Sequence, residues 1–225
     1  DGIPTNNETV LHSLRVYAFV DGQPAGHFYT KDGLDVNNPS FLMHLTMYST
    51  MTQKVDFYVV ANEAAMETPG SSVLLTENTT ETQLNHFTFT KLNTSKGLPM
   101  FCKQTETIDL TQLSDKTPAD PGHAGHTLLR QDLTFELKRP IGKLGVFAAK
   151  PVGENSSLRV TGLTVLASGT RTRNYLMPQT DETLKAITGI TGDISLEVVE
   201  EEVTKTLAEN ASQTDKENPA NYTPV

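Results

Sequence analysis

Histidine and cysteine are the residue types to consider first, because they could bind a metal ion or act as a nucleophile. His123 and His126 have an H-x-x-H spacing that could supply two metal ligands, but glycines flank them in a polar loop and no third ligand is identifiable. Cys102 is the single cysteine, so no intramolecular disulfide can form. It follows the apolar residues 99–101 without a nearby histidine, which favours a buried thiol over a nucleophile. We therefore expect no metal site, no cofactor and no catalytic cysteine.

Carboxylates are the other candidates, because a pair of them could serve glycoside hydrolysis. Glu197 and the run Glu200–Glu202 are typical of a solvated surface. Asp56 and Glu63 flank an apolar run but define no geometry by themselves. The sequence contains no glycine-rich phosphate loop, no G-x-S-x-G elbow and no CxxC pair. The residues thus predict no enzymatic activity.

Composition narrows the class of partner. The chain has 225 residues, enough for one large or two small β domains, and a net charge of −9. Without a basic stripe, this balance argues against nucleic acid and against an anionic membrane surface. No stretch approaches the roughly 18–20 apolar residues of a transmembrane helix. The chain starts at Asp1 without a methionine, so any export or lipid signal would lie upstream.

Short strands separated by turns are the elements that must position any site. Leu11–Val20 is a predicted strand closed by Asp21-Gly22, with Gly26–Thr30 pairing back across it. The β-branched and aromatic run Val55–Glu63 is typical of a strand leaving a buried sheet. The intervening segment 41–48 fits either a helix or a strand, and its short link to the next strand favours a hairpin.

The second half of the chain shows the same spacing. Leu128–Leu137 alternates most regularly, with Leu133, Phe135 and Leu137 on one side. Proline makes 98–101 a loop or an edge rather than a central strand. Thr180 is expected to cap a helical turn that runs to Ile187. Further strands are predicted at 86–90, 143–149, 158–166 and 193–199, an exposed loop at 111–126, and a loop or tail at 208–225. Together, the short strands and turns predicted along the chain indicate an all-β sandwich.

Four segments in order carry a resemblance to a known family. They are Leu14–Phe19 (LRVYAF) followed by Asp21-Gly22, Phe57–Glu63 (FYVVANE), Leu98–Met100 (LPM), and Leu137–Leu144 (LKRPIGKL), with a closing Tyr175–Pro178 (YLMP). This set resembles the fimbrillins of Bacteroidetes, the family of major and minor fimbrial subunits that includes anchor and tip proteins. Pro140 and Gly142 depart from that pattern, since the family usually has small or apolar residues there that sustain the strand.

The resemblance implies a transthyretin-like Greek-key β-sandwich over residues 1–178, the family's N-terminal domain. Residues 179–225 would be a partial or truncated second β unit or a C-terminal extension, because 47 residues (225 minus 178) are too few for a sandwich of about 100. It also implies export as a lipoprotein to the outer membrane and cell surface. Family stalk subunits polymerise after an arginine-directed protease removes an N-terminal strand. Arg15 lies inside a predicted strand, so we do not assign that cleavage to it.

The leading interpretation is a non-enzymatic, structural or adhesive fimbrial subunit that exchanges β-strands with other subunits. An open sheet edge recruits a strand through main-chain hydrogen bonds, and pockets receive alternate side chains. The predicted core and groove residues are Val16, Tyr17, Phe19, Phe57, Val59 and Ala61. Stalk, anchor and tip roles stay open, as do a host surface or glycan as further partners.

A carbohydrate-binding surface lipoprotein of a polysaccharide-uptake system is the alternative. It requires an exposed aromatic platform on which a sugar can stack. The absence of tryptophan counts against it, and the aromatic candidates are Tyr17, Phe28, Tyr29 and Tyr58.

Overall fold

The computed structural model describes residues 10–31, 40–68, 74–112, 131–142, 145–166, 173–186, 193–196 and 201–224. Its elements are mostly strands, and they fall into two compact units. One unit takes residues 5–141 and 173–183, and the other takes 1–4, 142–172 and 184–225. The all-β class predicted from the sequence is confirmed. The expected boundary at residue 178 falls within the stretch 173–183, which packs with the first unit.

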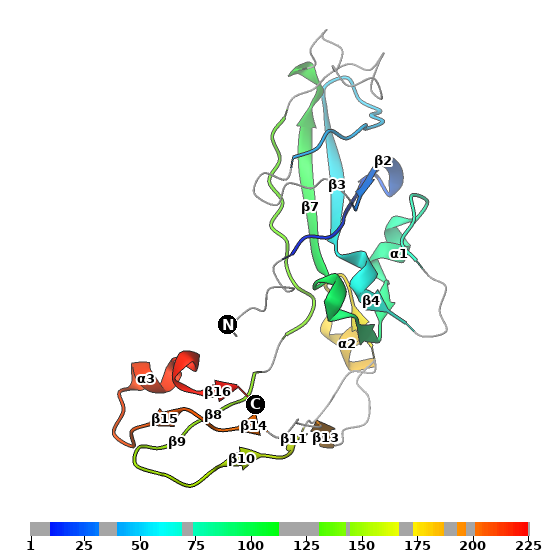
Figure 1. The fold of residues 1–225 in the computed structure, drawn as a ribbon. Coiled ribbons are helices and arrows are strands. Elements are labelled where there is room, and N and C mark those ends of the chain that lie inside the picture. Colours follow the sequence, from blue (N-terminus) through cyan, green and yellow to red (C-terminus); the bar gives the residue numbers. More distant parts are fainter. Residues whose placement is uncertain are drawn as a thin grey trace. The chain divides into compact units, whose positions relative to one another are not determined.

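A four-stranded antiparallel sheet is the centre of the first unit (Figure 1). Its strands follow the order β2-β1-β3-β7, with bounds β1 Leu14–Val20, β2 Gln23–Thr30, β3 Thr52–Ala61 and β7 Met100–Asp109. The strands predicted over 11–20, 26–30 and 55–63 are therefore confirmed, except that β3 ends at Ala61 and Glu63 begins a 3-10 turn, and β3 is interior as expected. The turn Asp21-Gly22 has positive φ at both residues, 49° and 76°, as a two-residue hairpin requires.

Two expectations about neighbouring segments need correction. The hairpin predicted between 41–48 and the next strand is not formed, since β3 pairs with β1 and β7. The segment is extended nonetheless. Proline at 99 led us to expect a loop or edge, and β7 is indeed an edge strand, but it continues for ten residues to Asp109. Polar inward residues hid this strand, because Gln104 and Glu106 break the apolar alternation.

Short elements complete the first unit. Helix α1 (Glu81–Asn85) is capped by Thr80, which accepts from the Gln83 amide while Gln83 reaches back to Thr80. Helix α2 (Asp181–Ala186) begins after Thr180, as predicted. The remaining bounds are β4 Met66–Glu67, β5 Thr88–Phe89, β6 Lys91–Leu92 and β12 Asn174–Tyr175, with 3-10 turns at Glu63–Ala65, Thr94–Lys96 and Leu110–Gln112. β4 pairs with β6, and β5 with β12.

The second unit consists of two-residue and four-residue strand pairs. β8 (Phe147–Ala148) pairs with β16 (Thr223–Pro224), β9 (Lys150–Pro151) with β15 (Thr206–Leu207), β10 (Arg159–Val160) with β14 (Glu201–Glu202), and β11 (Leu163–Leu166) with β13 (Asp193–Leu196). The strand predicted over 158–166 is thus split in two.

The predicted tail 208–225 is wrong in part, because it contains helix α3 (Gln213–Glu217), a 3-10 turn at Pro219–Asn221 and β16. Ser212 caps α3 by accepting from the Asp215 amide at 3.1 Å. Thr223 is buried, and its hydroxyl accepts from the amides of Thr204 and Lys205 at 2.9 and 3.0 Å. These contacts order a segment whose polar composition alone suggested a loop.

Candidate functional site

One side of the four-stranded sheet is a continuous layer of apolar side chains. We call it the apolar face; it comprises Leu14, Val16, Ala18, Val20, Ala25, Val55, Phe57, Val59, Ala61, Cys102, Ile108 and Leu110. Alternate residues of a strand point to the same side, which is why every second residue of β1 and β3 lies in it. Each is less than 9% exposed, so other parts of the chain must cover the face.

Segment 41–47 is the first cover. Its residues alternate between half-buried and exposed, and Phe41, Met43, Leu45 and Met47 pack against the apolar face. The Phe41 ring stacks on Phe28 of β2, with centroids 4.3 Å apart and planes 13° apart. The Thr46 amide donates to the Ala25 carbonyl at 2.6 Å. Gly26 makes this approach possible, because a Cβ there would lie 2.5 Å from the His44 carbonyl oxygen.

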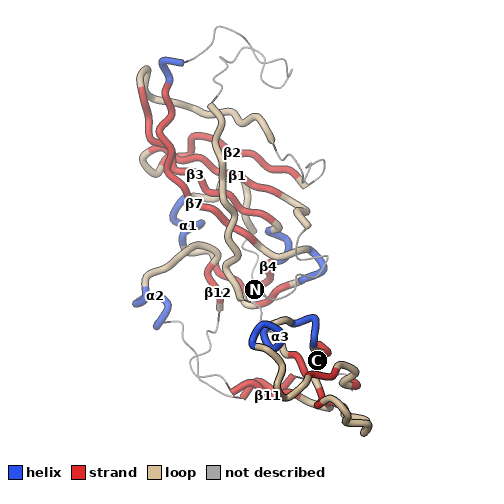
Figure 2. The backbone as a smooth tube through the Cα atoms, turned by 90° about the vertical axis from the view of Figure 1, so that its left-hand side faces the viewer, coloured by secondary structure: helices blue, strands red, loops and turns tan. Residues whose placement is uncertain are grey.

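Segment 131–137 is the second cover, and Figure 2 shows it as a long tan tube crossing in front of the sheet strands. Leu133, Phe135 and Leu137 pack against the apolar face, and Phe135 lies 5.4 Å from Phe57 between ring centroids. Lys138 ends it with a two-bond bridge to Phe101 of β7, at 2.7 and 2.8 Å. The alternation predicted over 128–137 is thus observed from 131, and residues 128–130 lie outside the described residues.

Neither cover belongs to a hydrogen-bonded sheet in the part of the chain that the structure describes. The inner layer of the sandwich is therefore a regular sheet, whereas its outer layer is two separate extended segments. Their inward side chains stay half-buried rather than buried. An extended segment with apolar residues on one side and an unpaired backbone offers main-chain hydrogen bonds to an added strand.

The structure divides the predicted groove residues between two sides of the sheet. Val16, Phe57, Val59 and Ala61 lie together on the apolar face. Tyr17 and Phe19 point to the opposite side, since they alternate with Val16 along β1. Strand periodicity alone could have separated the six residues.

The opposite side of the sheet carries an aromatic cluster that helix α1 and residues 173–183 cover. Phe19 meets Tyr58 edge to face with centroids 5.7 Å apart, and residues 173–183 contribute the buried Leu176 and Met177. The Tyr58 hydroxyl donates to a carboxylate oxygen of Glu81 at 2.7 Å. Burial, followed by this hydrogen bond, raises the pKa of Tyr58. Because helix α1 and its neighbours cover this side, it offers no free apolar layer among the described residues.

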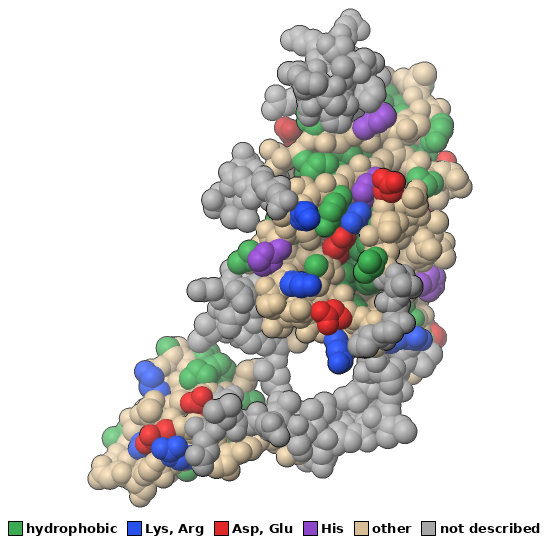
Figure 3. Space-filling view, turned by 45° about the vertical axis from the view of Figure 1, so that its right-hand side comes forward, with side chains coloured by type: hydrophobic (Ala, Val, Ile, Leu, Met, Phe, Trp, Pro, Cys, Tyr) green, Lys and Arg blue, Asp and Glu red, His purple; other side chains and the backbone are tan. Residues whose placement is uncertain are grey.

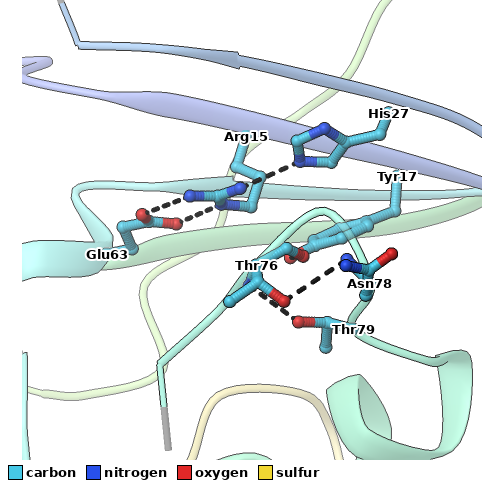
Figure 4. A network of polar contacts seen from close by, with 7 residues as sticks. All are labelled: Arg15, Tyr17, His27, Glu63, Thr76, Asn78 and Thr79. Carbon is cyan, nitrogen blue, oxygen red and sulfur yellow. Dashed lines mark hydrogen bonds and ion pairs between the residues drawn. The ribbon is translucent and has the colours of Figure 1, made fainter.

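A polar network lies at the end of β1 on this second side (Figure 4). The Arg15 guanidinium holds Glu63 through two bonds of 2.6 and 2.8 Å, and its Nη1 is 2.9 Å from Nε2 of His27. Its guanidinium carbon also lies 3.9 Å from the Tyr29 ring centroid. Burial lowers the pKa of Arg15, but the bond to Glu63 and its charge outweigh that effect and raise it. Burial and then the Arg15 charge lower the pKa of His27.

Asn62, next to this network, connects three chain segments. It has a left-handed backbone, with φ of 55°, and is 1% exposed. Its Oδ1 accepts from the His12 amide at 2.7 Å, and its Nδ2 donates to the Val10 and Leu98 carbonyls, each at 2.9 Å. The Arg15–Glu63 pair joins the LRVYAF and VVANE motifs, and the Asn62 bonds join VVANE to residues 10–12 and to Leu98. Both sets of contacts fix the end of the sheet.

An open depression borders the network, lined by Arg15, His27, Tyr29, Leu75, Thr76, Glu77 and Asn78. Tyr29 is 40% exposed there, whereas Tyr17 and Tyr58 are buried and Phe28 is half-buried. Of the four aromatic side chains considered for sugar stacking, Tyr29 is therefore the accessible one. Asn78 and Glu77 supply polar groups beside it.

The remaining chemical candidates add little to the site. Arg15 is buried within β1, in agreement with the expectation that it is a poor protease site. Cys102 is buried, and burial raises the pKa of its thiol. Among the described residues, no group of three or more histidine, cysteine, aspartate or glutamate side chains is placed to hold a metal ion. His123 and His126 lie outside the described residues.

Charge is mixed on the described surface. On the sheet-containing unit in Figure 3, acidic, basic and histidine side chains are interspersed with hydrophobic ones. None of the helices in the described residues has the length and apolar character needed to cross a bilayer.

Comparison with known proteins gives a fold-level likeness. No family model matches the sequence, and no curated protein matches it. A fimbrial assembly protein from Parabacteroides distasonis is 14% identical, with a TM-score of 0.42, over 98% of this chain and 80% of that chain. The C-terminally truncated tip fimbrial protein Mfa3 from Porphyromonas gingivalis is 15% identical, also with a TM-score of 0.42. That likeness covers 86% of this chain and 61% of Mfa3. Values this low assign neither function nor residue roles.

Proposed function

We propose that this chain is a structural or adhesive subunit of a cell-surface fimbria that assembles by β-strand exchange with neighbouring subunits. In this proposal the chain is exported to the outer surface as a lipoprotein, and the outer layer that covers the apolar face receives a strand of the neighbour. The incoming strand lies along the outer layer, beside segments 41–47 and 131–137.

The observation that supports the proposal is the outer layer formed by segments 41–47 and 131–137 in the described residues. Two extended segments put alternate apolar side chains on a buried sheet, yet neither has a ladder partner within the described residues. Backbone-to-backbone bonds join segment 41–47 to Ala25 of β2 and Lys138, next to segment 131–137, to Phe101 of β7, and the Thr134 carbonyl also accepts from the Gln104 side chain. A strand inserted there gains main-chain bonds and buries the half-exposed side chains of both segments. Burial stabilises the complex by about 25 cal/mol per Å² of apolar area.

A polymerisation assay tests the proposal. The purified chain is incubated with and without limited proteolysis, and samples are run unheated in SDS to detect a ladder of polymers. We expect a ladder that collapses on boiling, since strand exchange produces kinetically stable assemblies. Persistent monomers under both conditions would refute self-assembly of this chain by strand exchange and, with it, a stalk role.

Paired variants of segment 131–137 locate the interaction. Phe135→Asp places a charge on the inward side of the segment, and Thr134→Asp places the same charge on its outward side. We expect the first to abolish the ladder and the second to retain it, with thermal melting confirming that both variants fold. Equal ladders from both variants would show that this segment does not line the acceptor site.

Glycan binding is a second candidate because one exposed aromatic ring borders a polar depression. Tyr29 would stack on a sugar, with Asn78 and Glu77 as hydrogen-bonding groups. A glycan array probed with the wild-type chain and with Tyr29→Ala tests it. Binding that is lost in the variant would favour this reading over strand exchange, and an array without signal would reject it.

A further inference from the structure

One carboxylate lies on the apolar face. Glu106 of β7 faces the same side as Cys102 and Ile108, directly opposite Val55 of β3 in the sheet register. It is the one ionisable acidic or basic side chain that the four described strands place on that side. Its exposure is intermediate, so the carboxylate reaches solvent from an otherwise apolar layer.

Within the part of the chain that the structure describes, Glu106 has hydrogen-bond partners and no basic partner. The Gln104 side-chain amide donates to the Glu106 carboxylate and also to the Thr134 carbonyl of segment 131–137, at 3.3 Å for the latter. Among the described residues, no lysine or arginine forms an ion pair with Glu106. Gln104 thereby holds the carboxylate next to the segment that we propose as one wall of the acceptor site.

Covering this carboxylate has a definite energetic consequence. A strand added to the outer layer beside segment 131–137 removes the half-exposed Glu106 carboxylate from water, and burying a carboxylate without an ion-pair partner costs several kcal/mol. An incoming lysine or arginine at the matching position offsets that cost, whereas an apolar or acidic residue does not. Selection of partners by penalising wrong ones is a common source of specificity.

We infer that Glu106 determines which strand the acceptor site takes: one with apolar residues at alternate inward positions and a lysine or arginine placed to meet this carboxylate. The inference rests on the proposed function, because it describes the occupant of the same site. Gln104 is a positioning residue, since it acts by orienting the Glu106 carboxylate.

Model strands of about ten residues test the inference. Threonine and valine alternate in each peptide, and the central valine is kept or replaced by arginine or glutamate. Fluorescence anisotropy with the full chain measures the dissociation constant of each labelled peptide. We expect the arginine peptide to bind about tenfold more tightly than the valine peptide, and the glutamate peptide to bind most weakly.

Variants of Glu106 sharpen the assay. In Glu106→Gln the arginine preference should disappear, and in Glu106→Lys the glutamate peptide should bind most tightly. The matched control is Glu136→Lys, the same substitution on the exposed outward side of segment 131–137, which should keep the arginine preference. Glutamine has the size and shape of glutamate without its charge, so Glu106→Gln tests the role of the charge even if Glu106→Lys does not fold.

The outcomes separate the two proposals. If the wild-type chain binds none of the peptides, the acceptor site itself is refuted, and the strand-exchange function with it. If it binds them without an arginine preference, or if the preference survives in Glu106→Gln, the role of Glu106 is refuted while the acceptor site stands.

Discussion

Replacing Asn62 with alanine should be among the most destabilising single changes in the sheet-containing unit. The side chain is 1% exposed and bonds the backbone of His12, Val10 and Leu98 at 2.7, 2.9 and 2.9 Å. Each such bond contributes about 1 kcal/mol net, and its loss leaves buried backbone groups unsatisfied. Alanine also pays about 1 kcal/mol for the left-handed backbone that asparagine tolerates. Together, the three bonds and the backbone term predict that Asn62→Ala lowers the free energy of unfolding by about 4 kcal/mol.

Urea unfolding followed by near-ultraviolet circular dichroism measures this loss, because Tyr17 and Tyr58 are buried in the same unit. Asn93→Ala is the control, since its side-chain contacts are exposed, and it should change the unfolding free energy by about 0.5 kcal/mol at most. An Asn62→Ala loss of less than about 1.5 kcal/mol would refute the additive reasoning and imply that water replaces the lost bonds.

Asn62→Asp provides an independent check of the same geometry. Aspartate keeps the acceptor for the His12 amide and tolerates the left-handed backbone. It loses both donors, however, and places an oxygen against two carbonyl oxygens. This arrangement favours the protonated carboxyl, so the folded-state pKa rises and the variant should regain stability as the pH falls from 7 to about 4. Stability that falls in parallel with the wild type would contradict the assigned bonds.

Three further predictions concern the packing and the polar network. Gly26→Ala should lower the free energy of unfolding by about 1–3 kcal/mol, because the added Cβ pushes segment 41–47 away from the sheet. The control is Gly162→Ala, whose Cβ meets nothing within 4 Å and should be nearly neutral. Equal shifts of the melting temperature in the two variants would contradict the close approach at Gly26. Glu63→Gln should lower the free energy of unfolding in urea by about 3 kcal/mol, because it leaves the buried Arg15 guanidinium without its carboxylate. The control Glu202→Gln breaks the exposed Arg159–Glu202 pair, which is 3.9 Å long, and should lower it by less than about 0.5 kcal/mol. Because the pKa of His27 is lowered in the folded state, the unfolded chain binds the proton more readily, and the free energy of unfolding should decline as the pH falls below about 6.5. His27→Gln should remove this part of the decline. A variant with the same pH profile as the wild type would contradict the prediction.

The motifs of the family resemblance have a structural role in this chain. Arg15 and Glu63, 48 residues apart, form the ion pair between LRVYAF and VVANE, and Asn62 binds Leu98 of the LPM motif. The motifs therefore hold one end of the sheet together. The side chains that line the proposed acceptor site come mainly from less distinctive segments, among them 41–47 and 131–137.

Sequence reasoning located strands whose signal is local. β1, β3 and the Asp21-Gly22 turn could be predicted because β-branched residues and a positive-φ dipeptide act over a few neighbours. It missed most of β7, whose inward residues include Gln104 and Glu106. It also gave segment 41–48 a hairpin partner that it does not have. Pairing partners depend on long-range contacts, which periodicity does not encode.

The amino-acid sequence by itself determined the all-β class and the residues that alternate between two faces. Only the tertiary structure decided which face is covered by helix α1 and residues 173–183 and which is covered by segments 41–47 and 131–137. Helix α1 and residues 173–183, which are far along the chain from β3, cover the aromatic side, whereas segment 41–47, which lies between β2 and β3, and the more distant segment 131–137 cover the apolar face. The tertiary structure also places the Glu106 carboxylate on that face. The physical reason is that burial is a property of surfaces meeting in space, and a single strand specifies only what each of its two sides can offer.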